Sequence, residues 1–114
     1  MTEAMLAYEN GDYPRASRLF FSMLMQNPLS SELWHALAAT HKMEYRYHEA
    51  IEAWKLSSLL NPQSPLPYFY QAECYLAQDQ IEKALVAFDE ALQRPCTDDL
   101  IEKIEAMKEV IAYD

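Results

Sequence analysis

The fold is decided by the sequence LWHALAAT at residues 33–40 and EAIEAWKL at residues 49–56, followed by Pro62. Small and aromatic residues of this stretch recur along the chain at a constant step of 34 residues. The recurring residues form three series: Ala4, Ala38 and Ala72; Ala16, Ala50 and Ala84; and Phe20, Trp54 and Phe88. Pro28 and Pro62 keep the same step, and Pro95 comes one residue early. Because several independent positions obey one period, the chain is predicted to repeat one structural unit three times.

The order of these residues resembles the tetratricopeptide repeat, in which a large apolar residue, a leucine and a small residue precede an alanine, an aromatic residue and a proline. The second unit preserves this order best, at Trp34, Leu37, Ala38, Ala50, Trp54 and Pro62. In each unit two helices cross closely, because small residues allow the approach and aromatic residues fill the next layer. We therefore predict an all-α fold of three tetratricopeptide helical hairpins plus a C-terminal capping helix, forming a right-handed superhelix with a concave groove.

The predicted boundaries make residues 1–114 a single tetratricopeptide-repeat domain. Its parts are repeat 1 at about 1–30, repeat 2 at about 31–64, repeat 3 at about 65–97 and the capping helix at about 98–112. Prolines and capping residues predict helices that end near 26, 44, 60, 78 and 93. Aligning Ala4 with Ala38 leaves Met1 at the fifth position of its unit, so repeat 1 is expected to be N-terminally incomplete.

The expected N-caps are Asp12, Ser30 or Ser31, and Ser64. Pro65 is expected at the first position of its helix, where its missing N–H group costs nothing.

Composition excludes several classes of function. The 114 residues carry 18 acidic and 9 basic side chains, a formal charge of −9, which disfavours nucleic acid and anionic membranes as partners. A single glycine, Gly11, excludes glycine-rich phosphate loops. No apolar run reaches the roughly 18 residues that span a bilayer, and the start of the chain does not resemble a cleaved signal peptide. Two cysteines are too few for a disulfide framework, which favours a reducing cytoplasm.

Residues that could support catalysis or metal binding do not form a workable pattern. The stretch His48-Glu49-Ala50-Ile51-Glu52 begins like a zinc-protease helix but has Glu52 where the second histidine ligand is required. Asp98 and Asp99 suit the positive end of a helix dipole better than paired acid–base catalysis. Cys74 lies in an apolar helical stretch and is expected to be a buried thiol. We predict no enzymatic activity, no metal and no cofactor.

Function is expected on the concave face, which the first helix of each hairpin lines. Counting along these helices predicts a largely apolar and aromatic groove with a few charges. The predicted groove residues are Met5, Tyr8, His35, Ala39, Lys42, Met43, Leu66, Phe69, Glu73 and Leu76. The alternative for each, and notably for Leu76, is packing against the neighbouring hairpin.

One familiar use of this fold is disfavoured. Tetratricopeptide co-chaperones that bind the C-terminal carboxylate of heat-shock proteins use lysine, asparagine and arginine in the groove, because a carboxylate needs cationic and amide donors. Here the corresponding residues are His35, Ala39, Leu66 and Tyr70. The sequence instead favours an extended peptide with spaced apolar side chains.

The sequence also resembles one branch of the repeat family, the class II chaperones of bacterial type III secretion (the SycD/LcrH/IpgC-like proteins). The residues that carry the resemblance are Gly11-Asp12-Tyr13, Leu33-Trp34, Pro65-Leu66-Pro67 and the segment YQAECYL at residues 70–76. A generic repeat has no reason to place Glu73 and Cys74 after the small residue Ala72.

This resemblance implies a chaperone of the bacterial cytoplasm that holds the hydrophobic translocator proteins of a type III secretion system. It would bind an extended apolar N-terminal segment of the partner in the groove, and so prevent aggregation and premature association. The acidic body would keep the complex in solution. The family also forms homodimers through an additional N-terminal helix. The alternative is a general protein–protein interaction scaffold with the same fold.

Overall fold

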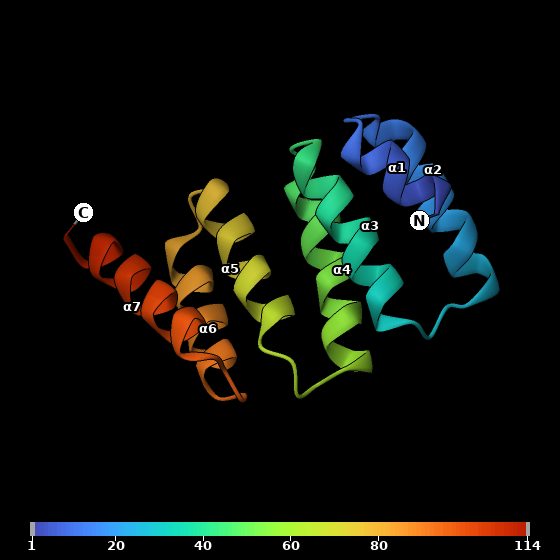
Figure 1. Ribbon diagram of the computed structural model, residues 1–114. Helices are drawn as coiled ribbons and strands as arrows, with labels where there is room; N and C mark the ends of the chain where they lie inside the picture. The colour runs from blue at the N-terminus through green and yellow to red at the C-terminus, as the bar shows by residue number, and fades with distance from the viewer. Residues whose placement is uncertain (1, 114) are drawn as a thin grey trace.

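The computed structural model describes residues 2–113 of the chain. Within this range seven α-helices follow one another: α1 (Glu3–Glu9), α2 (Tyr13–Gln26), α3 (Ser31–Met43), α4 (Tyr47–Leu60), α5 (Leu66–Ala77), α6 (Ile81–Leu92) and α7 (Asp98–Tyr113). The helices pack chiefly against their neighbours in sequence, so that three hairpins stack side by side and α7 follows at the end (Figure 1). The predicted all-α fold of stacked helical hairpins is confirmed. None of the described helices is long and apolar enough to cross a membrane.

The residues that recur every 34 positions form the core. In each of the three series, every side chain is at most 3% exposed. Small residues at the helix crossings bring the two helices of a hairpin together, and Phe20, Trp54 and Phe88 fill the space beside them. Burying one such aromatic side chain stabilises the fold by roughly 1.5–3 kcal/mol. The residues that recur with the 34-residue period are therefore those that the fold requires to be buried.

Polar side chains cap the first three helices. The hydroxyl of Thr2 accepts a hydrogen bond from the backbone N–H of Met5 (3.2 Å), which caps α1. Asp12 caps α2 and Ser30 caps α3 in the same way. Each cap satisfies a backbone donor that would otherwise lack a partner, which is typically worth about 1 kcal/mol.

The start of α5 differs from the prediction by one residue. Pro65 is the N-cap, the helix begins at Leu66, and no side chain makes a capping hydrogen bond. The Ser64 hydroxyl accepts instead from the N–H of Leu66, at a long 3.4 Å. Pro67 then lies at the second helical position, where its missing N–H group removes no intrahelical bond.

The turns inside the three hairpins share one backbone geometry. Gly11, Tyr45 and Asp79 have φ angles of 79°, 62° and 59°, in the left-handed region, and they are spaced by the repeat period. At each turn this residue donates its N–H to the carbonyl three residues earlier, and the next residue donates to the carbonyl five residues earlier. This pair of bonds is the Schellman motif, which ends a helix by satisfying its last carbonyls.

Helix α7 covers the end of the stack with one face. Ile104 is fully buried there, and Leu100, Met107 and Ile111 pack against the core between α5 and α6. Val110, on the same helix, is 64% exposed. The helix extends to Tyr113, one residue beyond the predicted end.

The shared turn geometry predicts that two substitutions change the free energy of unfolding in opposite directions. Gly11→Ala should lower the free energy of unfolding by about 1 kcal/mol, because a β-carbon is disfavoured in the left-handed region. Tyr45→Gly should raise it by about 0.5–1 kcal/mol, because Tyr45 is 78% exposed and loses little packing. Urea denaturation of the two variants measures both changes. Shifts in the same direction would contradict this account of the turns.

Candidate peptide-binding groove

A hollow of about 210 Å³ lies where α1, α3 and α5 meet, with its base on α4. The residues that line it are Tyr8, His35, Ala39, Lys42, Met43, Trp54 and Tyr70. The structure thus brings together five of the predicted groove residues, from α1 and α3. It adds Trp54, which the repeat pattern assigned to the core alone, and Tyr70, which the comparison with carboxylate-binding co-chaperones placed in the groove but which the predicted set left out.

The base of the hollow is built from aromatic rings. Trp54 and Tyr70 are stacked, with ring centroids 5.1 Å apart and an angle of 18° between the planes. His35 is tilted against both rings, 6.0 Å from Trp54 and 5.4 Å from Tyr70. Trp54 is 1% exposed, so its indole N–H needs a partner inside the protein. It donates to Nδ1 of His35 at 2.9 Å.

The two charged side chains beside this hollow neutralise each other. Lys42 Nζ, on α3, donates to Glu73 Oε1, on α5, at 2.9 Å, and both side chains are at most one-third exposed. Nζ also lies 5.5 Å from the centroid of the Tyr70 ring. Burial alone would lower the pKa of Lys42, but the hydrogen bond and charge of Glu73 outweigh it, and the pKa is raised. A peptide that enters this hollow would therefore contact a neutralised ion pair.

A second hollow, of about 180 Å³, lies at the N-terminal ends of α3 and α5. The residues that line it are Ser31, Glu32, His35, Ser57, Asn61, Ser64, Leu66 and Pro67. The predicted groove residue Leu66, which is 43% exposed, belongs here. Because His35 lines both hollows, the two are neighbours across its ring.

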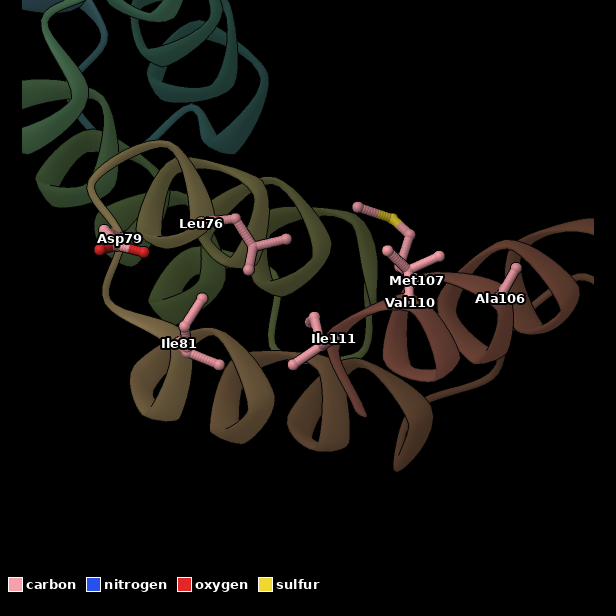
Figure 2. A pocket seen from close by; sticks show the side chains of 7 residues that line it. All are labelled: Leu76, Asp79, Ile81, Ala106, Met107, Val110 and Ile111. Atoms are coloured by element: carbon pink, nitrogen blue, oxygen red, sulfur yellow. The ribbon is translucent and has the colours of Figure 1, made fainter. Parts of the chain in front are cut away.

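Three predicted groove residues, Met5, Leu76 and Phe69, lie away from the two hollows. Met5 is an exposed residue of α1 and is absent from the lining of both hollows. Leu76 packs against the α5–α6 core, as the alternative interpretation expected, and borders a separate apolar hollow of about 740 Å³. That hollow lies between the α5–α6 turn and α7, where Leu76, Ile81, Met107 and Ile111 face it (Figure 2).

The prediction of Phe69 as a groove residue is wrong. Its side chain is 2% exposed and packs in the core against Phe88, with Lys103 Nζ of α7 5.1 Å from its ring centroid. The physical reason is that α7 covers this side of α5. The adjacent residue Tyr70, about 100° further round the helix, faces α3 instead.

Phe69→Ala should therefore act on stability. The expected loss is about 3–5 kcal/mol in the free energy of unfolding, from lost burial plus the cavity left behind. Thermal melts followed by far-ultraviolet circular dichroism measure it, with Leu66→Ala as the exposed control on the same helix. A Phe69 variant as stable as that control would contradict the buried position.

The partly buried histidines His35 and His41 predict how stability depends on pH. Burial lowers the pKa of His35 from its ordinary value of 6.5. Burial also lowers the pKa of His41, although Glu44 and Glu49 oppose the change. As pH falls through 6.5 the unfolded chain binds protons that the folded chain still excludes, so the free energy of unfolding decreases.

Urea denaturation between about pH 7.5 and about pH 5.5 should show this loss, and it should be smaller in His35→Gln. The exposed His48 supplies the control, since His48→Gln removes a histidine without touching the groove. Equal pH dependence in wild type and His35→Gln would contradict the assignment to His35.

No protein-family model and no curated protein matches the sequence. Solved structures do match. SycD of Yersinia enterocolitica, in complex with a peptide of the translocator YopD, has a TM-score of 0.90 at 21% identity, covering 96% of this chain and 87% of SycD. PcrH in complex with the chaperone-binding region of PopD has a TM-score of 0.87 at 21% identity, covering 96% and 86%. The chain has the fold of a type III secretion translocator chaperone.

This fold is also found with a different kind of partner. The first tetratricopeptide domain of Spaghetti (RPAP3), bound to the HSP90 peptide SRMEEVD, has a TM-score of 0.82 at 15% identity, covering 96% of this chain and 88% of that one. A chain of the CopN–Scc3 complex has a TM-score of 0.83 at 26% identity, covering 95% of this chain and 64% of that one. The partner of a translocator-chaperone fold must therefore be argued from the groove side chains.

Proposed function

We propose that the protein is a chaperone of type III secretion translocators. It binds an extended apolar segment of the translocator in the hollows of α1, α3 and α5, and so prevents aggregation and premature association in the bacterial cytoplasm. The observation that carries the proposal is the aromatic groove in which the ion pair of Lys42 with Glu73 is internally neutralised. Apolar side chains gain most from such a surface.

The similar structures support the same partner class. SycD and PcrH, which share the fold, are seen with segments of the translocators YopD, PopD and PopB. The charge of −9 suits a carrier of apolar cargo, because it keeps the complex in solution. A dimeric SycD is among the similar structures, so we include a homodimer in the proposal.

The chemistry of the described residues gives no support to an enzyme. Residues 2–113 contain no group of three or more histidine, cysteine or acidic side chains that could hold a metal ion. Cys74 is fully buried, and burial raises the pKa of its thiol to about 11. A thiol with that pKa is a poor nucleophile at neutral pH.

Co-expression with a translocator from the same bacterium tests the proposal. The wild-type chain should keep an otherwise insoluble translocator in solution as a stoichiometric complex on size-exclusion chromatography. Met43→Asp and Leu66→Asp should weaken the complex at least about tenfold, because each would bury a carboxylate against apolar cargo. Both residues are more than 40% exposed, so the fold should survive the change.

Leu59→Asp on α4 is the matched control, since Leu59 is 75% exposed and lines neither hollow. It should bind as the wild type does. A translocator that stays insoluble with the wild-type chain would contradict the chaperone proposal and favour a general interaction scaffold. Normal binding by both groove variants would contradict only the location of the site.

A further inference from the structure

His35 lies where the two hollows meet. Its ring lines the hollow around Lys42 and Tyr70 and also the one around Leu66. An extended segment that places apolar side chains in both hollows must therefore cross the edge of this ring. The protonation state and tautomer of His35 therefore determine which hydrogen-bonding group the crossing segment contacts.

The contact with Trp54 determines which ring nitrogen of His35 carries the proton. An indole N–H can only donate, so Nδ1 of His35, 2.9 Å away, must be the acceptor. A neutral imidazole that accepts at Nδ1 carries its proton on Nε2. Among residues 2–113 no protein atom accepts a hydrogen bond from Nε2 of His35. Nε2 is also not a buried atom that lacks a partner, so solvent or a ligand can reach it. The Nε2–H group is thus a donor available to the groove.

The third hairpin shows that packing alone does not require a histidine here. Phe69 and Phe88 occupy the places of His35 and Trp54 one repeat later, and their rings lie in nearly the same arrangement. The centroids are 6.0 Å apart in both pairs, with angles of 54° for the phenylalanines and 56° for the histidine and tryptophan. Two hydrocarbon rings therefore satisfy the same geometry. The polar pair stands in the hairpin where the groove is open.

We propose that His35 is a specificity-determining residue, whose Nε2–H donates a hydrogen bond to a backbone carbonyl of the bound segment. The carbonyl lies between one apolar side chain seated beside Leu66 and another seated beside Met43. This inference rests on the proposed function and adds a polar requirement to an otherwise apolar site. A buried carbonyl without a donor would weaken binding, so the fixed donor selects segments whose register places a carbonyl there.

The charged and titratable groups around the ring favour a neutral acceptor. Glu32 and Lys42 come from α3, Tyr8 from α1, and Tyr70 and Glu73 from α5. Lys42 is already paired with Glu73, so a carboxylate on the ligand would find no free cation in the hollow. Burial lowers the pKa of His35, which keeps the ring neutral at pH 7. A neutral donor beside the Lys42–Glu73 pair and the acidic Glu32 suits an uncharged peptide carbonyl better than a ligand carboxylate.

The first test examines the free protein. Long-range proton–nitrogen NMR correlations of ¹⁵N-labelled protein at about pH 7.5 should show Nε2 of His35 protonated and Nδ1 unprotonated. The exposed His48 in the same spectrum provides an internal reference. A proton on Nδ1 of His35 would overturn the inference, because Trp54 could not then donate to that atom.

The second test measures affinity for two probes, the YopD peptide seen with SycD and the chaperone-binding region of PopD seen with PcrH. His35→Phe combined with Trp54→Phe recreates the pair of the third hairpin and leaves no orphan donor. It should fold, by circular dichroism, yet bind about tenfold more weakly. His35→Gln, which can accept from Trp54 and still donate, should bind within about threefold of the wild type.

The third test changes the peptide instead of the protein. Esters replace the backbone amides of the probe one at a time, because an ester carbonyl accepts a weaker hydrogen bond. One interior position should lower wild-type affinity several-fold, and the same ester should have no further effect in the double phenylalanine variant. If both probes bind, the double variant binds as the wild type and no ester is selective, the inference is overturned while the proposed function stands. If neither probe binds the wild type and the co-expressed translocator also stays insoluble, the proposed function fails, and this inference fails with it.

Discussion

The close crossing of two helices within each hairpin is the constraint on which the rest of the structure depends. Ala38 on α3 and Ala50 on α4 have no exposed surface and lie in one core cluster, so a larger side chain at either place would force the helices apart. The aromatic residue one turn later, Trp54, is then buried beneath His35 and Tyr70. Its indole N–H must find an acceptor, and the ring that supplies it faces the groove. The packing of the core thereby determines which polar group faces the groove.

The sequence predicts the helices well because their ends have local chemical causes. The caps at Asp12 and Ser30 and the prolines between hairpins act within a few residues, and α4 ends at the predicted residue, Leu60. The three left-handed turns are harder to predict from the sequence. Only Gly11 is a residue type that favours a positive φ angle, whereas Tyr45 and Asp79 adopt one because the hairpin geometry requires it. Aligning the turns by the repeat period would have found them.

The groove was harder to predict because it depends on contacts between hairpins. The repeat period makes Phe69 the equivalent of His35, yet α7 lies close enough to Phe69 to cover it, whereas His35 remains partly exposed. Tyr70, whose equivalent one repeat earlier is Ala36, has a groove role with no counterpart in the preceding unit. The ion pair between Lys42 and Glu73 joins residues 31 positions apart and follows from no local pattern. Sequence periodicity locates the groove, and neighbouring hairpins determine which side chains remain in it.

Packing chiefly between helices that are neighbours in sequence also has a consequence for folding. Such contacts close short loops, so little chain entropy is lost before each contact forms, and folding belongs to the rapid regime of locally connected helical proteins. The stack behaves as a one-dimensional series in which any hairpin can nucleate and its neighbours then add. Among the described residues, helix α7 packs through a single face on the α5–α6 core and is the element expected to open first.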